Sequence, residues 1–327
     1  MQWLANINKD TLTILSRSVS PDEVNRYQRQ TSLSPWSLGV DISQKDMAIL
    51  AAAWALTFFG IPILVTLTPY WYISVIMTAA SIVISLVIFS RAYDRSIRRH
   101  IRLHDFAAQN ALRYDPIGQV GAVGVGLLFD VGHSRRYRGV LSCEQDGQRT
   151  MEIGRYQYTV GSGKHQQTYT WRYAAVRLPR KVPHMVLDAK QNNASLMNRA
   201  IFSNLPVILP NSQRITLEGN FDDYFTLYGP KKYDVDVRYV LTPDVMVALI
   251  DASSHFDVEL VDDLAFFYTV DDGKTDARVI GDMLTVLEAV GHELHDQTDR
   301  YADGRVDDAW QKNVVAEQGR RLRSWRL

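Results

Sequence analysis

The longest uncharged stretch of the chain, residues 47–90, contains no Asp, Glu, Lys or Arg. The hydrocarbon core of a bilayer is about 30 Å thick, so roughly 20 residues of apolar α-helix cross it. Residues 47–67 and 72–90 are each long enough, and Pro69 lies between them. The sequence therefore predicts a transmembrane helical hairpin near the N-terminus. Two buried core helices are the alternative, but neither segment has a polar face.

Residues inside and between the two predicted spans refine the hairpin. Tyr70, Trp71 and Tyr72 surround the turn, where aromatic rings with polar tips suit the headgroup region. Gly60 and Pro62 predict a kink in the first span, because proline removes a backbone hydrogen bond.

Basic residues flank both spans and are absent from the turn between them, which predicts a cytoplasmic position for both termini. The chain is thus expected to be a multi-pass protein of the cytoplasmic (inner) membrane. The lone Cys143 agrees, since secreted domains more often carry disulfides. The flanking basic residues are Arg26, Arg29, Lys45, Arg91, Arg95, Arg98, Arg99 and Arg102.

Charge is balanced over the whole chain, with 36 basic and 36 acidic residues, but it is unevenly distributed. Residues 251–308 contain sixteen Asp and Glu and four Lys and Arg, whereas residues 91–102 and 320–327 are basic. This pattern predicts a domain whose basic parts face anionic lipid and whose acidic part faces away. No basic patch with interleaved aromatic residues stands out, so nucleic acid is not a predicted partner.

The predicted fold class is α+β, with the hairpin followed by a cytosolic domain of antiparallel β-sheet packed with helices. We divide the chain into a cytoplasmic arm (1–45), the hairpin (46–90), a juxtamembrane stalk helix (91–114), the α+β domain (115–296) and a polar, basic tail (297–327).

Elements of the α+β domain follow from periodicity and turn residues. Asp146-Gly147 and residues 161–164 each predict a hairpin turn between strands. Alternating aromatic residues in strands 155–160 and 168–178 predict a packed sheet with an exposed face available for binding. Pro179–Pro183 predicts a turn. Further predictions are helices over 21–30, 194–202, 242–251 and 275–296, an aromatic helical face over 221–227, and strands over 236–241, 256–260 and 264–270.

Two glycine-rich stretches resemble phosphate-binding loops without their context. The tetrapeptide 161–164 (GSGK) is followed by His165 rather than Ser or Thr and is predicted to lie between strands. The glycines of 118–126 follow a predicted helix instead of a strand. We interpret both as hairpin tip or linker, and no cofactor is predicted.

Several histidines and acids are candidate metal-binding or catalytic groups. His292 and His295 are three residues apart, whereas the zinc-protease helix needs a spacing of four. The acids of 299–308 lack the EF-hand pattern. Residues 253–257 contain Ser, His and Asp but no nucleophile elbow. His184 is interpreted as a buried turn residue. No catalytic or metal-binding residue is predicted.

Two segments carry a resemblance to a known family: RITLEGNFDDYFTLYGP from Arg214, and VRYVLTPDVMVALIDASSHFDVELVDDLAFFY from Val237. They resemble an uncharacterised family of bacterial membrane proteins, most like its actinobacterial members. The resemblance covers roughly residues 101–268. It implies two transmembrane helices attached to a cytosolic domain of unknown function, and it implies no activity.

The predicted function is that of a membrane-anchored cytosolic interaction module, with the bilayer and either a protein partner or a second copy as its partners. The alternatives are a small-ligand sensor coupled to the hairpin and, less favoured, a hydrolase. The C-terminal RRLRSWRL is expected to lie on anionic lipid or to be a free tail. The predicted lipid-contacting residues are Trp71, Arg91, Arg95, Arg98, Arg99, Arg320, Arg321, Arg323 and Trp325.

Overall fold

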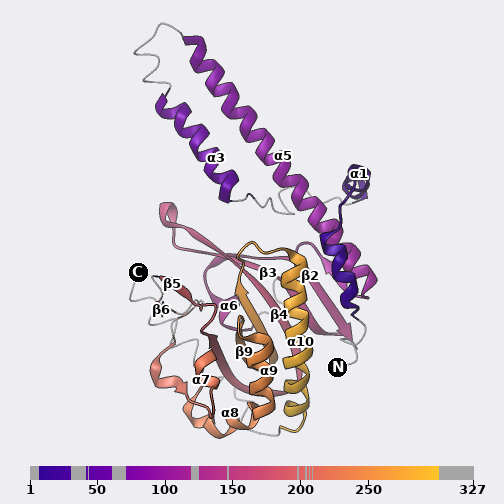
Figure 1. Ribbon diagram of the computed structural model, residues 1–327, viewed down its shortest axis with the longest axis vertical. Helices are drawn as coiled ribbons and strands as arrows, with labels where there is room; N and C mark the ends of the chain where they lie inside the picture. Colours follow the sequence, from indigo (N-terminus) through magenta and orange to yellow (C-terminus); the bar gives the residue numbers. More distant parts are fainter. Residues whose placement is uncertain are drawn as a thin grey trace. The chain divides into compact units, whose positions relative to one another are not determined.

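The chain divides into two compact units in a computed structural model (Figure 1). One unit comprises residues 17–104, and the other combines residues 1–16 with residues 105–327. The structure describes residues 7–30, 42, 44–60, 71–118, 125–145, 147–196, 199–202, 205, 207 and 209–301.

Helices make up the described part of the 17–104 unit: α1 (Pro21–Gln30), α3 (Gln44–Ala55), the π-helical turn η3 (Leu56–Gly60) and α5 (Trp71–Gln109), which continues into the other unit. The predicted helix start at Ser20-Pro21 is confirmed. Ser20 Oγ accepts from Glu23 N at 3.3 Å and Glu23 Oε2 from Ser20 N at 2.9 Å, a capping box.

α5 is unbroken over 39 residues because its apolar half runs into its amphipathic half without proline or glycine. Tyr72–Gln109 is the described helix long and apolar enough to cross a membrane, with a mean hydropathy of 2.4 in its most apolar window. α3 ends at Ala55 and residues 61–70 lie outside the described part, so the structure does not confirm the two-span hairpin. Gly60 ends the π-helical turn, while Pro62 and Pro69 lie outside the described residues.

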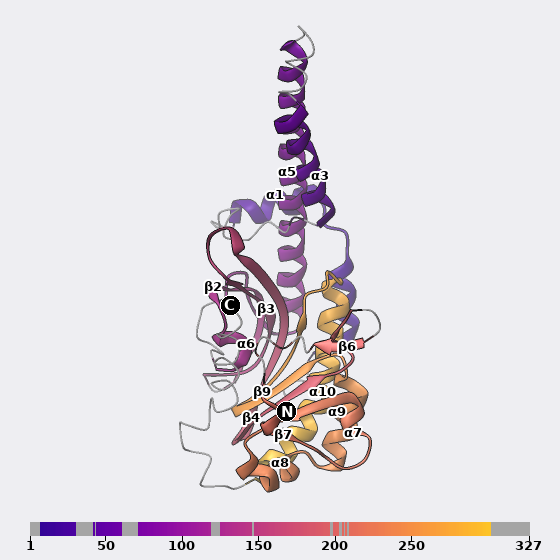
Figure 2. The ribbon, with the colours of Figure 1, turned by 90° about the vertical axis from the view of Figure 1, so that its left-hand side faces the viewer.

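The other unit is built on a seven-stranded antiparallel sheet (Figures 1 and 2). Its order is β1-β2-β3-β4-β8-β7, with β9 paired to β4. The strands are β1 (Arg113–Asp115), β2 (His133–Gln145), β3 (Gln148–Val160), β4 (Gln167–Ala189), β7 (Arg214–Ile215), β8 (Phe225–Tyr228) and β9 (Asp257–Val270). Both predicted hairpins, β2–β3 and β3–β4, are therefore confirmed.

Helix α10 (Asp276–Asp299) packs against β4 on one face of the sheet and against α9 (Pro243–Ser253). The opposite face carries an aromatic core beneath α6 (Leu127–Asp130). The remaining elements are η2 (Lys9–Ser16), η4 (Gly163–His165), η5 (Asn211–Gln213), η6 (Lys231–Tyr233), α7 (Phe221–Tyr224), α8 (Asp234–Val240), β5 (Ala194–Leu196) and β6 (Arg199–Phe202).

Several local predictions are wrong. Residues 194–202 form the paired strands β5 and β6 rather than a helix, since a nine-residue helix is marginal and strand pairing satisfies the same backbone groups. Residues 236–240 of the strand predicted over 236–241 belong to helix α8, although Val235 and Val237 alternate with polar residues as in a strand. Buried Val237 and Val240 are one helical turn apart, whereas Val235 is 78% exposed.

The segment Pro179–Pro183 does not turn the chain but lies inside β4. The pairing of β4 with β9 shifts register between Arg177 and Val182 and again before Met185. Prolines are tolerated at such irregularities because no ladder hydrogen bond is lost there. The two strands predicted over 256–260 and 264–270 are likewise one strand, β9. The positive φ of Asp262, 53°, marks the irregularity in β9 opposite that in β4.

The strand aromatics do not form the exposed binding face that we predicted. Tyr156, Tyr158, Trp171 and Tyr173 are each at most 2% exposed and pack in the core beneath α6. Phe129 of α6 makes an edge-to-face contact with Tyr156, with the ring centroids 4.8 Å apart, so the helix covers this face of the sheet.

Candidate functional site

The first candidate surface is the apolar exterior of α3, η3 and α5. Large side chains on these elements are strongly exposed, which is costly in water and natural in lipid. Only 11% of the most apolar window of α5 is buried. The exposed residues are Met47, Ile49, Leu56, Phe58, Phe59, Tyr72, Val75, Ile76, Ile82, Val83, Ile84, Leu86, Val87 and Phe89.

Side-chain hydrogen bonds join α3 and the π-helical turn η3 to α5. Thr57 Oγ1 and Ser81 Oγ are 2.6 Å apart, and both residues are buried. Trp54 Nε1 donates to Ser85 Oγ at 3.1 Å. Thr57 lies in the π-helical turn and also donates to Ala53 O at 2.9 Å. Such contacts are typical of helix pairs in lipid, where small polar residues replace the hydrophobic effect as the source of association.

The predicted lipid-contacting arginines on α5 have different surroundings. Arg91 is exposed. Arg95 Nη2 lies 2.6 Å from Asp46 Oδ2, which joins the start of α3 to α5. Arg98 pairs with Asp94 at 2.7 Å and donates from Nη1 to Val19 O, and Arg99 is half-buried. The side chain of Trp71 and the whole of Arg320, Arg321, Arg323 and Trp325 lie outside the described residues, so their lipid contacts stay predictions.

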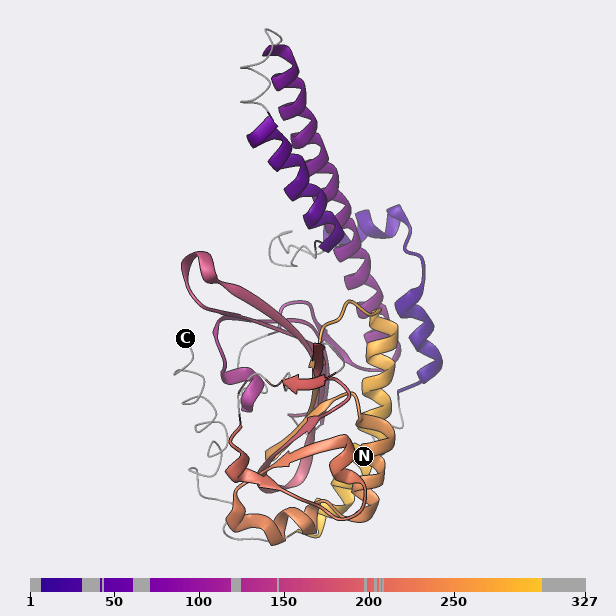
Figure 3. The same cartoon turned by 60° about the vertical axis from the view of Figure 1, so that its left-hand side comes forward.

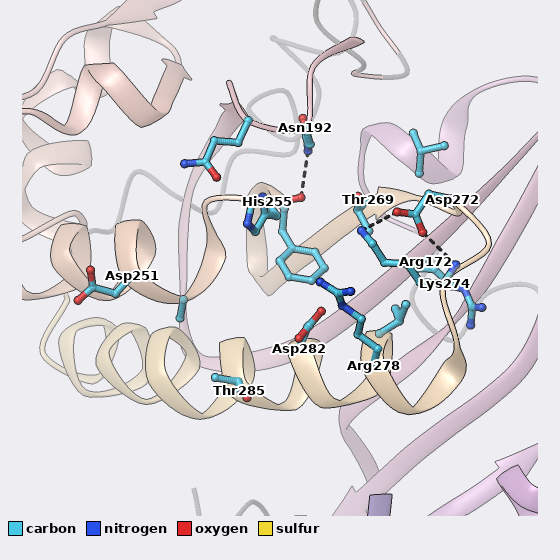
Figure 4. Close-up of a pocket in the computed structure, with 15 residues that line it drawn as sticks. Arg172, Asn192, Asp251, His255, Thr269, Asp272, Lys274, Arg278, Asp282 and Thr285 are labelled. Carbon is cyan, nitrogen blue, oxygen red and sulfur yellow. Dashed lines mark hydrogen bonds and ion pairs between the residues drawn. The ribbon is translucent and has the colours of Figure 1, made fainter. Parts of the chain in front are cut away.

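The second candidate surface is a cleft of about 620 Å³ in the sheet-containing unit (Figure 4). It is lined by α10, the end of β9, the turn before β9 and the turn after β4. Arg278 and Asp282 point from α10 into the cleft, and Asn192 Nδ2 donates to His255 O at 3.3 Å on its opposite side. Sequence reasoning missed the cleft because its walls combine Arg172 and residues 191–192 with residues 251–285, which lie far along the chain.

The charges of the cleft are of both signs. Lys274 Nζ pairs with Asp272 Oδ2 at 2.5 Å, and Arg172 Nη1 pairs with Asp276 Oδ1 at 2.7 Å. Arg278, Asp251 and Asp282 form no ion pair within the described ranges. They are therefore available to a ligand, and both a cationic and an anionic group can find a partner there.

Two buried carboxylates, Asp188 and Asp257, lie at the end of β4 and the start of β9. The register that pairs Leu187 with Val258 places Asp188 opposite Asp257. Asp257 Oδ1 accepts from Ala189 N at 2.9 Å. Burial, followed by the nearby Asp188 carboxylate, raises the pKa of Asp257 well above its usual value. Burial and Asp188 likewise raise the pKa of Tyr228.

A second buried polar pair, His184 and Glu259, lies on the same face. His184 Nε2 is 2.7 Å from Glu259 Oε1, and both side chains are 1% exposed. Glu259 also accepts from Leu127 N at 2.8 Å, which ties α6 to β9. His184 lies within β4 and not in the turn that we predicted. The pair is enclosed by the core, so it supports the fold and no reaction is assigned to it.

The other candidate metal-binding and catalytic residues do not assemble into a site. His292 and His295 are 3.7 and 3.5 Å from Asp296, and no group of three or more metal-ligating side chains occurs in the part of the chain that the structure describes. Ser253 Oγ donates to Leu249 O at 2.8 Å within α9, so it faces neither His255 nor Asp257 as a nucleophile would. Residues 163–165 form the β3–β4 hairpin tip, as predicted.

The comparisons with known proteins assign no function to these surfaces. No family model and no curated protein matches the chain. The crystal structure of the mycobacterial trehalose monomycolate transport factor A, TtfA, is similar with 10% sequence identity and a TM-score of 0.38, covering 61% of this chain and 93% of that chain. Similarity at this level carries no argument about function. The resemblance to a two-span bacterial family stays a prediction.

Proposed function

We propose that the chain is a membrane-anchored interaction module of the cytoplasmic membrane, with two spans and both termini in the cytoplasm. The observation that carries the proposal is the position of the N-terminal segment. η2 packs against α10, so residues before the apolar stretch and residues after it form the same compact unit.

Hydrogen bonds and an ion pair support this common location. Asn8 N donates to Asn110 Oδ1 at 2.9 Å, and Asn110 Nδ2 donates to Thr11 Oγ1 at 2.8 Å. Lys9 Nζ pairs with Glu288 Oε2 at 2.5 Å. A chain that leaves one unit at residue 16 and rejoins it at residue 105 crosses a membrane an even number of times.

The second crossing then falls on residues 47–67, since this is the other apolar stretch long enough to span. The contact between Thr57 and Ser81 and the ion pair between Asp46 and Arg95 both support an antiparallel helix pair. The arginines after residue 90 favour the cytoplasm for the soluble unit.

Cysteine labelling in intact cells tests this topology. In a Cys143→Ser background, Ser18→Cys, Thr68→Cys and Gln166→Cys are each treated with a membrane-impermeant maleimide. We expect labelling of Thr68→Cys alone, and labelling of all three after the cells are opened. Labelling of Ser18→Cys or Gln166→Cys in intact cells would overturn the proposed orientation.

The interaction role is tested by crosslinking the full chain in its native membrane and then purifying it by affinity. We expect a stoichiometric protein partner or a crosslinked second copy. A chain that is recovered alone and as a monomer, at several crosslinker lengths, would refute the role.

A small-ligand sensor is the second candidate, and the cleft is the observation that favours it. Its volume is within the usual range for ligand sites, although its walls are more polar than most. Native mass spectrometry of the purified chain should then show a retained small molecule that Arg278→Gln releases and the exposed control Lys231→Gln retains. Equal spectra for the two variants would exclude the cleft as the site.

A further inference from the structure

The start of β2, the end of β3 and the start of β4 meet at one end of the sheet and form one surface. His133 pairs with Thr159, Arg136 pairs with Gln157, and Tyr158 pairs with Tyr169. We call residues 133–136 and 155–172 the basic sheet end. The β3–β4 hairpin within it extends beyond the neighbouring strands (Figures 1 and 3).

The basic sheet end has an excess of positive charge. Residues 133–136 and 155–172 contain no Asp or Glu, and their basic residues are Arg135, Arg136, Arg155, Lys164 and Arg172. Two of these are neutralised, because Asp271 pairs with Arg155 at 2.5 Å and with Arg172 at 3.2 Å.

Arg135 and Arg136 are both exposed on this surface. Among the described residues, Arg135 donates to the backbone carbonyls of Asp130, at 2.5 Å, and Gly132, at 3.2 Å. Neither guanidinium forms an ion pair with any residue that the structure describes. Guanidinium groups match phosphate geometry with two parallel hydrogen bonds, so both are suited to a phosphate-bearing partner.

An exposed aromatic residue accompanies the charges. Tyr169 is 37% exposed, and its ring stacks on buried Tyr158 at a centroid distance of 5.5 Å. Its hydroxyl donates to Gln167 Oε1 at 2.8 Å. His133 Nε2 lies 2.9 Å from Gly161 O, which ties β2 to the base of the hairpin tip. A supported aromatic ring with a polar tip is typical of side chains at the membrane interface.

We propose that the basic sheet end is a contact surface for anionic lipid headgroups. Arg135 and Arg136 bind the headgroup phosphates. Tyr169 shares a sheet face with Tyr158, whereas Arg136 pairs with Gln157 on the opposite face, so the end of the sheet meets the interface edge-on. The inference rests on the proposed membrane anchor, because a tethered domain meets the bilayer at a high effective concentration and weak contacts then suffice. Nucleic acid shares the phosphate chemistry, but the anchor favours lipid as the partner.

The test uses the full chain reconstituted in nanodiscs, with Cys143→Ser and a fluorophore on Ser162→Cys at the hairpin tip. Quenching by headgroup-spin-labelled lipid is measured in phosphatidylcholine alone and with phosphatidylglycerol added. We expect quenching with phosphatidylglycerol that is lost in phosphatidylcholine, in high salt, and in the Arg135→Gln/Arg136→Gln variant. Tyr169→Ser should reduce it, and the matched control Lys231→Gln/Arg238→Gln should retain it.

Two results would overturn the proposal while leaving the anchor intact. One is an unquenched tip in a chain that resists carbonate extraction. The other is quenching that the arginine variant leaves unchanged while it releases co-purifying RNA. A chain extracted by carbonate would instead refute the anchor, so the two failures are distinguishable.

Discussion

The residues whose substitution should matter most for stability are the buried polar groups of β4 and β9. His184, Asp188, Asp257 and Glu259 share one face of the sheet and are each at most 4% exposed. Buried charges are costly unless they are paired. His184 and Glu259 pair with each other, whereas Asp257 is buried beside the like-charged Asp188.

Glu259 provides the first prediction. Glu259→Leu removes the acceptor for both Leu127 N and His184 Nε2, and leaving such buried groups unpaired costs about 3 kcal/mol. Glu259→Gln keeps one acceptor oxygen and should cost less. Urea unfolding of the full chain in detergent, followed by tryptophan fluorescence, measures both changes. A Glu259→Leu variant as stable as the wild type would contradict the assigned role.

Asp257 gives a prediction about pH. Its folded pKa lies above the unfolded value of about 3.9, so the folded state binds the extra proton. The free energy of unfolding therefore falls as pH rises from about 4 through the folded pKa. Asp257→Asn has no such titration and keeps an acceptor for Ala189 N.

The stability of Asp257→Asn relative to wild type should thus increase with pH, at up to about 1.4 kcal/mol per pH unit within that window. Unfolding curves measured from pH 4 upward test this, with exposed Asp223→Asn as the control. Parallel pH profiles for wild type and Asp257→Asn would show that Asp257 is not the titrating group.

At the scale of elements, α5 is one helix with two environments. Its first half exposes apolar side chains, whereas Ala92, Ile97 and Ile101 in its second half are at most 5% exposed. Ile97 and Ile101 pack with Val19 and Val24 of the α1 region. The predicted stalk helix is therefore continuous with the apolar segment, and the N-terminal arm packs on it in part.

Ile82 lies near the middle of the apolar half and is 46% exposed. Ile82→Lys places a charge where lipid is expected, at a cost of about 2.5–3.5 kcal/mol. We expect a larger fraction of the variant to be released by carbonate extraction than of wild type or of Ile82→Ala. Equal extraction of the lysine and alanine variants would argue against lipid around α5.

At the scale of the whole chain, Asn110 joins the segment before the apolar stretch to the unit after it. It is 3% exposed, accepts from Asn8 N, and donates to Thr11 Oγ1 and Phe106 O. Asn110→Ala removes these contacts at about 1 kcal/mol each. Amide hydrogen exchange of residues 8–16 should accelerate while that of β4 is unchanged. Unaltered protection of residues 8–16 would show that other contacts hold the segment.

The sequence alone determined much of the local structure. It predicted α1 from Ser20-Pro21, the hairpins on either side of β3, and α10 from its apolar face, because caps, turn residues and periodicity act over a few residues. The apolar stretch of 47–90 is equally local, and α5 contains its second predicted span, 72–90.

Tertiary structure decided what depends on distant residues meeting. It made 236–240 helical by burying Val237 and Val240, and it carried β4 through Pro179 and Pro183 by register shifts against β9. The cleft and the pair of Asp188 and Asp257 each combine segments that no local pattern relates. Contacts of this kind follow from strand pairing across the whole sheet, and pairing is set by the burial of complete faces.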